Sequence, residues 1–290
     1  MNFYTGQALL EVCEKETISI SEAMKRREME LGSISEEEIM TKLARAWEIM
    51  QNAATNPIKE PRKSIGGLLG GEAKKMNAFR EAGNNLCGPM LSRALAYAMA
   101  VLEVNATMGL IVAAPTAGSS GILPGVLLSY KEVMGVLDDV IYKGLLNASA
   151  IGYLLMRNAS VSGAEAGCQA EVGSASAMAA SAVVEMNGGT PRMCLAAASM
   201  ALSNLLGLAC DPIAGLVESP CQTRNSIGAA NALTAAEMVL AGITIPVPFD
   251  EMADAMHRIG KNLPFELRET ALGGCAGTPT GCSLGCNLCG

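Results

Sequence analysis

Residues 130–210 are rich in Ala, Ser and Gly, and their helical segments show little contrast between a polar and an apolar face. A helix that is apolar on all sides is stable only when other helices cover it, so these segments belong inside a large bundle. Aromatic residues make up only 3% of the chain, and the core must therefore consist of Ala, Leu, Ile, Val and the 18 Met. Small side chains let helices approach closely, and Met fills irregular gaps. We therefore predict an all-α fold with one large helical domain.

The two ends of the chain differ in pattern. Residues 1–60 are predicted to be amphipathic helix, because Ser35 followed by Glu38 is a capping-box signature and apolar residues then recur at helical spacing until Asn56-Pro57. A last amphipathic helix is expected from about Phe249 to Gly260. We predict that the helical domain spans residues 1–272 and that residues 273–290 form an irregular tail rich in Gly and Cys.

Charge and hydropathy exclude several classes of protein. The net charge is −7, and no run of Lys or Arg is interleaved with aromatic residues, so a nucleic-acid partner is not expected. No secretory leader is visible at the N-terminus. The charge-free run Met193–Cys210 contains Ser199, Ser203 and Asn204, which favours a buried core helix over a membrane span. The expected location is the cytoplasm, with no membrane partner.

Two loops have unusual composition. Residues 63–71, Lys-Ser-Ile-Gly-Gly-Leu-Leu-Gly-Gly, contain too much Gly for a stable helix and form either a flexible surface loop or a lid whose N–H groups face a ligand. Residues 114–121, Ala-Pro-Thr-Ala-Gly-Ser-Ser-Gly, precede a predicted helix whose free N–H groups suit a carboxylate. A plain turn between helices is the alternative for this second loop.

The ten cysteines fall into groups with different surroundings. Disulfides are not presumed in a cytoplasmic chain, and Cys13, Cys87 and Cys194 are interpreted as buried, inert thiols. The other three candidates each lie near a Gly or Pro that bends the backbone: Cys168, Cys210 and Cys221. They form no CxxC pair, which argues against a zinc ribbon. Three thiolates on a [4Fe–4S] cluster would leave one iron open as a Lewis acid, which favours dehydration over electron transfer.

Two long motifs carry a resemblance to a known family. They are Ser-Gly-Ala-Glu-Ala-Gly-Cys-Gln-Ala-Glu-Val-Gly-Ser-Ala at 162–175 and Leu-Gly-Leu-Ala-Cys-Asp-Pro-Ile-Ala-Gly-Leu-Val-Glu-Ser-Pro-Cys-Gln-Thr-Arg-Asn at 206–225. With the loop at 114–124 and the segment 267–274, they resemble the iron–sulfur L-serine dehydratases, in a match that covers almost the whole chain from about residue 60.

The resemblance implies a lyase of amino-acid degradation and gluconeogenesis that converts L-serine to pyruvate and ammonia without pyridoxal phosphate. It implies an all-helical catalytic domain and a [4Fe–4S] cluster on Cys168, Cys210 and Cys221. In some members an additional α/β domain precedes this one; in others it is a separate β subunit. The chain starts in the catalytic part, so it resembles the α subunit of a heterodimer with a β partner.

The sequence carries fewer signals for the site residues other than the ligands. The base that removes the Cα proton is not identified and is assigned either to the partner chain or to an unknown group, because the single His257 is more typical of a structural role. Glu165 and Glu171 flank Cys168, where packing is as good an interpretation as a role near the metal. The candidates for binding the substrate are Thr116, Gly118, Ser119, Ser120, Gly121, Lys63, Ser64, Arg224 and Asn225.

The tail departs from the family pattern. Cys275, Cys282, Cys286 and Cys289 crowd the last residues, and Cys286 or Cys289 is a candidate cap for the open iron. A second metal site and plain oxidation-prone thiols are the alternatives.

Three other functions compete with serine dehydration. A dehydratase of another small hydroxy amino acid, such as threonine, would need the same chemistry. An iron–sulfur redox sensor would need an output module, and a cluster carrier would usually be small with exposed thiols. Neither of these last two patterns is visible in the sequence.

Overall fold

The chain folds into a bundle of helices, described here by a computed structural model that covers residues 2–289 and the side chains of residues 2–286. No β-strand occurs within residues 2–289, which confirms the predicted all-α class. The helices are α1 (Gly6–Glu16), α2 (Ile20–Gly32), α3 (Glu36–Lys59), α4 (Glu72–Glu81), α5 (Gly88–Ala106), α6 (Ile122–Met134), α7 (Asp138–Asn158), α8 (Gly163–Ala166), α9 (Ser174–Met186), α10 (Pro191–Ser203), α11 (Cys221–Leu240), α12 (Phe249–Asn262) and α13 (Pro279–Cys289).

The Ala-rich helix α9 is the centre of the bundle. It packs against α7, α10, α11 and α6, and its residues from Ser174 to Val184 are all buried. Ala and Ser at most of these positions allow the neighbouring helices to approach on every side. This is the arrangement that the lack of amphipathic contrast predicted.

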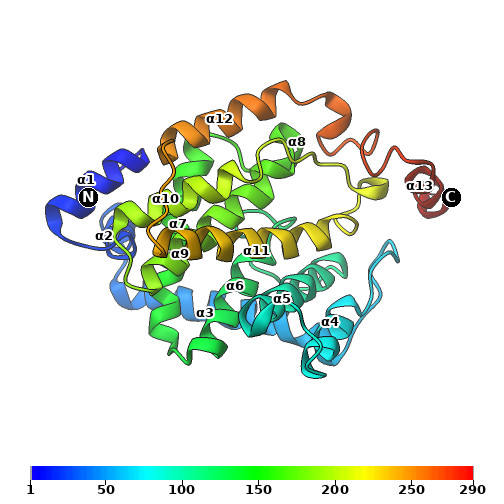
Figure 1. Cartoon of the computed structure of the whole chain (residues 1–290), viewed down its shortest axis with the longest axis horizontal. Coiled ribbons are helices and arrows are strands. Elements are labelled where there is room, and N and C mark those ends of the chain that lie inside the picture. The colour runs from blue at the N-terminus through cyan, green and yellow to red at the C-terminus, as the bar shows by residue number, and fades with distance from the viewer. Residues whose placement is uncertain (1, 290) are drawn as a thin grey trace.

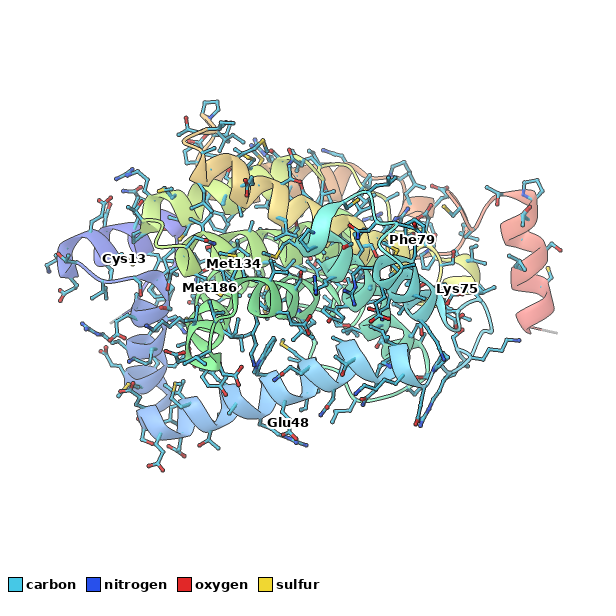
Figure 2. All side chains as sticks on the ribbon, turned by 60° about the horizontal axis from the view of Figure 1, so that its bottom comes forward. Cys13, Glu48, Lys75, Phe79, Met134 and Met186 are labelled. Carbon is cyan, nitrogen blue, oxygen red and sulfur yellow. The ribbon has the colours of Figure 1, made fainter. Side chains whose placement is uncertain are left out.

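The two ends of the chain lie at opposite ends of the molecule. Figure 1 shows α1 and α2 at one end, and α13 beyond the bundle at the other. In Figure 2, Cys13 on α1 and Lys75 on α4 mark the same two ends. The α13 helix packs against the short turn Ile213–Gly215, which is itself part of the segment that leads to α11.

Helix α3 shows how local sequence sets an element. The Ser35 hydroxyl accepts from the Glu38 amide at 3.2 Å, and the Glu38 carboxylate accepts from the Ser35 amide at 3.0 Å, which confirms the capping box. Trp47 and Met50 then face the core. The expected end at Pro57 is wrong by two residues, because Pro57 is accommodated in the last turn and the helix continues to Lys59.

Two other expectations need correction. The tail is not irregular throughout, because α13 occupies residues 279–289 after a series of turns. Cys87, expected to be buried, is exposed at the start of α5. Cys13 and Cys194 are buried as predicted. The last amphipathic helix is α12, which ends two residues later than predicted.

Candidate metal centre

Cys168 lies where the backbone changes from one kind of helix to another. Gly167, with φ of +79°, ends α8, and the π-helical turn Gln169–Gly173 follows Cys168 directly. A positive φ of this kind is readily adopted by Gly, and π turns inside helices are frequent at functional sites. Because the turn is helical, Glu171 is on the same side of it as Cys168, three residues earlier.

Cys210 is fixed by a segment near the end of the chain. Its amide donates to the Leu267 carbonyl at 2.8 Å, and its carbonyl accepts from the Glu269 amide at 2.7 Å. Glu269 has φ of +61°, which is unusual for a residue other than Gly. The motif at 267–274 therefore acts as a support for Cys210.

These turns bring two thiols and one carboxylate together. The ligand atoms of Cys168, Glu171 and Cys210 all lie within 4.8 Å of one another. The Glu171 Oε2 atom is 4.0 Å from the Cys168 sulfur and 3.9 Å from the Cys210 sulfur. Among the side chains of residues 2–286, this is the one such cluster of His, Cys, Asp and Glu, and neither Glu165 nor His257 is part of it. Glu165 instead accepts from the Ser160 hydroxyl at 2.6 Å.

Two glycines leave space beside the cluster of Cys168, Glu171 and Cys210. A Cβ atom on Gly163 would lie 2.5 Å from Glu171 Oε2 and 2.8 Å from the Cys210 sulfur. A Cβ atom on Gly118 would lie 3.0 Å from Glu171 Oε1. Any larger residue at position 163 would therefore fill the space in which a bound group could contact these atoms.

The electrostatics of the cluster disfavour negative charge in the absence of a cation. Burial raises the pKa of Glu171, and the charge of Glu269 adds to this, although the Thr116 hydrogen bond opposes both. The pKa of Cys210 is raised, first by its interaction with Cys168 and then by burial. A bound metal supplies the missing positive charge and reverses this balance, since thiols ligate as thiolates. The donor set therefore fits an iron–sulfur cluster.

Cys221 is close to these groups but stands apart from them. It begins α11, is buried, and lies outside the 4.8 Å cluster. Burial raises its pKa first, and the charges of Cys168 and Glu171 add to this shift. Cys221 begins the helix whose first turn also carries Arg224, and Arg224 contacts Cys168, so Cys221 lies on the helix turn next to the site.

Arg224 contacts the thiol side of the site. Its Nη1 atom is 3.6 Å from the Cys168 sulfur, donates to the Ala209 carbonyl at 2.8 Å and forms an ion pair with Asp211 at 2.6 Å. Burial alone would raise the pKa of Asp211, but the Cys275 amide and Arg224 hold it below its usual range. The sequence analysis predicted Arg224 as a substrate-binding residue. In the structure, the Nη1 atom of its guanidinium instead contacts Cys168 and Asp211.

The loop at 114–121 meets the cluster through one hydroxyl. Thr116 donates to Glu171 Oε1 at 2.7 Å and lies 3.1 Å from the Ser119 hydroxyl, whereas Ser120 donates back to Ala117. The Gly121 amide donates to the Asn225 side chain at 2.9 Å, and Asn225 in turn donates to the Gly118 carbonyl at 2.7 Å. Of the predicted residues here, Thr116 and Gly118 reach the site, and the others shape the loop.

The loop at 63–71 is held by a residue that sequence reasoning missed. The Ser64 hydroxyl donates to Glu218 at 2.6 Å, and Glu218 is buried, whereas the Lys63 side chain is exposed. Glu171 was also undervalued. Its spacing of three residues from Cys168 was the available signal, whereas nothing local in the sequence connects Glu218 with residue 64.

The described residues do not test either of the two predicted caps of the open iron. Cys286 is exposed in α13, and the side chain of Cys289 lies outside the described residues. The proposal that either caps the iron therefore stays a prediction. The tail does reach the site at Cys275, whose amide donates to Asp211 at 2.6 Å.

Comparisons with known proteins agree on one family. Residues 15–276 match the family described as Serine dehydratase alpha chain. The probable L-serine dehydratase alpha chain of Bacillus subtilis is 46% identical over 282 residues, which is 97% of this chain and 94% of that protein. The L-serine dehydratase alpha chain of Peptoniphilus asaccharolyticus is 43% identical, over 96% of this chain and 95% of that protein. The L-serine dehydratase of Mycobacterium bovis is 40% identical over 94% of this chain but only 61% of its own length.

The hydropathy of the helices was compared with that of membrane spans. In residues 2–289, every helix is too short or too polar to cross a bilayer.

Proposed function

This chain belongs to the serine dehydratase alpha chain family, and from that premise we propose that it converts L-serine to pyruvate and ammonia on an iron–sulfur cluster. The observation that carries the proposal is the meeting of Cys168, Glu171 and Cys210 within 4.8 Å, with Cys221 nearby. A redox-inert structural metal site would be closed on all sides by protein ligands. Here Gly118 and Gly163 leave room next to the ligand atoms.

The overall reaction balances without a redox change. Serine loses its α-proton and its β-hydroxyl as one molecule of water, and the resulting enamine becomes an imine. Water then hydrolyses the imine to pyruvate and ammonia. No oxidant or reductant is consumed, so the reaction needs an acid for the hydroxyl and a base for the proton rather than an electron carrier.

We assign the cluster to Cys168, Cys210 and Cys221. A [4Fe–4S] cluster held by these three residues would keep one iron without a protein ligand, and it would supply Lewis-acid chemistry for the loss of the substrate hydroxyl. Arg224 places a positive charge 3.6 Å from the Cys168 sulfur, where a thiolate ligand would lie. Thr116 fixes one oxygen of Glu171, so that the other oxygen remains directed at the two thiols.

We further propose that a β chain completes the enzyme. The longer relative from Mycobacterium bovis contains additional chain beyond the part that matches, and the relatives from Bacillus and Peptoniphilus are named alpha chains. His257 lies outside the cluster of Cys168, Glu171 and Cys210, which favours a partner as the source of the base. Cytoplasmic location is part of the same proposal, because the open iron requires a reducing compartment.

The test is a pyruvate assay after anaerobic reconstitution with iron and sulfide. Replacing a residue that only orients a metal ligand costs about 10–100-fold, so Cys168→Ala, Cys210→Ala and Cys221→Ala should each cost at least that. Cys194→Ala, which removes another buried thiol, is the matched control and should retain activity. Dependence of the activity on the β chain would support the partner assignment. Activity on threonine but not on serine would change the assigned substrate to threonine.

A cluster that assembles on the wild-type chain but gives no turnover of serine, with the β chain present, would contradict the proposed reaction. Full activity of all three cysteine variants would contradict the cluster assignment.

A further inference from the structure

The glycine loop, residues 63–71, is fastened to the turn that precedes Cys221. Glu218 lies three residues before Cys221, and both of its carboxylate oxygens accept hydrogen bonds from the loop. The Gly66 amide donates to Oε1 at 2.7 Å. The Ser64 hydroxyl and the Leu68 amide donate to Oε2 at 2.6 Å and 3.0 Å. One side chain thus binds three loop donors from about 150 residues away in the sequence.

The loop also has a fixed shape of its own. The Ser64 hydroxyl accepts from the Leu69 amide at 3.0 Å, and the Ser64 amide donates to the Leu69 carbonyl at 3.0 Å. Ser64 therefore closes the loop and connects it to Glu218 with a single hydroxyl. This arrangement excludes the Gly66 and Leu68 amides from binding a substrate, since Glu218 already occupies them.

The contact between the loop and the turn leaves no free space. A Cβ atom on Gly66 would collide with the side chain of Leu216 and would lie 2.8 Å from Glu218 Oε1. Gly66 thus lets the loop backbone approach the side chains of Leu216 and Glu218 closely. Loop and turn are in direct van der Waals contact as well as hydrogen-bonded.

A second connection runs from the other side of Cys221. Gln222 donates to the Glu103 carboxylate at 3.2 Å, and Glu103 accepts from the Ala73 amide at 2.9 Å in the first turn of α4, which follows the loop. Figure 1 shows the loop and α4 on the same side of the bundle as the segment that leads into α11. The residues on either side of the Ser219–Cys221 stretch therefore hold both ends of the loop.

The charge of Glu218 makes this contact cooperative. Its side chain is only 2% exposed, and within residues 2–286 it has no salt-bridge partner, so the donors that stabilise its carboxylate come from the loop. A buried carboxylate that loses its donors carries a large desolvation cost. Opening of the loop therefore requires the turn at Glu218 to move as well.

We propose that Glu218 is a positioning residue that couples closure of the glycine loop to the placement of Cys221, so that the loop is ordered only when the turn carrying this cysteine is in place. The functional role of this coupling rests on the proposed function, because Cys221 is a proposed cluster ligand. It gives the glycine loop, including its exposed Lys63, a defined position relative to the cluster of Cys168, Glu171 and Cys210.

The test uses hydrogen exchange and thiol labelling on the full iron-free chain. Glu218→Gln keeps the shape of the side chain but replaces one carboxylate oxygen with an NH2 group. That group donates hydrogen bonds and cannot accept one from the loop. Loss of one hydrogen bond to a charged group corresponds to about 10-fold or more in the opening equilibrium, so peptides covering residues 64–69 should exchange about 10-fold faster. Alkylation of Cys221 should accelerate by a similar factor, whereas alkylation of Cys194 should not.

Two further variants keep the outcome interpretable. Ser64→Ala removes one loop donor and should show the same changes in smaller measure, even if Glu218→Gln folds poorly. Glu185→Gln alters another carboxylate that accepts from a backbone amide, that of Ser21, and should leave the loop unchanged. Unchanged hydrogen exchange of residues 64–69 in both Glu218→Gln and Ser64→Ala would contradict the proposal that Glu218 holds the glycine loop closed.

Faster exchange of the loop without faster labelling of Cys221 would overturn the coupling. Because these measurements need no iron and no turnover, they stand or fall separately from the serine dehydratase proposal. In the reconstituted enzyme, the coupling further predicts a higher KM for serine in Glu218→Gln together with a lower iron content.

Discussion

Buried thiols occur in two regions of this molecule, and only one of them has the features of a ligand site. Cys13 and Cys194 lie near Glu185, just as Cys168 and Cys210 lie near Glu171. In both regions burial raises the pKa of a cysteine. Burial and a neighbouring carboxylate therefore do not distinguish the two.

The two regions differ in the regularity of the backbone around the cysteines and in the presence of a guanidinium beside a sulfur atom. Cys13 and Cys194 belong to the regular helices α1 and α10, and Glu185 is satisfied by Asn147 at 2.7 Å and by the Ser21 amide. Figure 2 shows Cys13 on α1, at the end of the molecule away from α13. Around Cys168 and Cys210, by contrast, the helix is interrupted and a guanidinium lies 3.6 Å from one sulfur. An interrupted helix and a nearby positive charge, rather than burial, distinguish the thiols that we propose as ligands.

The largest expected effect comes from breaking the ion pair between Arg224 and Asp211, which is largely buried, whereas the ion pair of the other region, between Arg192 and Glu14, is exposed. Arg224→Ala leaves the buried Asp211 without its cation, and loss of one partner of such a pair costs about 3–5 kcal/mol. Glu185→Gln, in the other region, keeps a hydrogen-bonding group and should cost about 1 kcal/mol. Urea unfolding of the iron-free chains measures both. Equal losses would contradict the distinction drawn between the regions.

A smaller effect is expected from filling the space beside the ligands. Gly163→Ala places a methyl group against Glu171 and Cys210, so it should cost about 1–3 kcal/mol and reduce iron binding. Gly173→Ala is the matched control in the same segment, because its nearest neighbour would be 3.8 Å away. Iron content after reconstitution and the urea midpoint are the readouts. If Gly163→Ala binds as much iron as Gly173→Ala, the space is not needed.

The smallest effect concerns the thiols of the regular helices. Burial, with the charge of Glu185, raises the pKa of Cys13 from 9.0 to about 12. The unfolded chain therefore releases this proton first, and the stability contributed by the neutral thiol is full below pH 9 and falls as the pH rises toward 12. The slope is at most about 1.4 kcal/mol per pH unit. Cys13→Ala should remove this part of the alkaline destabilisation, as measured by urea midpoints at about pH 8 and about pH 10. An unchanged slope would show that Cys13 is not held neutral.

The helical architecture could be predicted from the sequence because most of its elements carry a local signal. The Ala-rich segments predicted the central helix α9, and the Ser35–Glu38 box predicted the start of α3. The tail helix α13 was missed, since Gly and Cys are poor helix formers and its packing against residues 213–215 is tertiary.

The site was predictable only in part. The three cysteines were proposed as ligands from their motifs, and the structure brings two of them, Cys168 and Cys210, together. Glu171 approaches them because of a π turn that has no sequence pattern of its own. Arg224 and Ser64 were expected to bind substrate, yet their partners Asp211 and Glu218 become visible only once the chain is folded. The contact between Ser64 and Glu218 spans 154 residues and depends on packing, which periodicity and spacing do not encode.

The most direct test of the ligand assignment is the iron and sulfide content of reconstituted variants. The account predicts that Cys168→Ala, Cys210→Ala and Cys221→Ala each lose the cluster, and that the double variant Cys13→Ala with Cys194→Ala retains it at the wild-type ratio of iron to chain. Retention of a full cluster by any of the first three, or its loss in the double variant, would contradict the claim that Cys168, Cys210 and Cys221 hold the cluster.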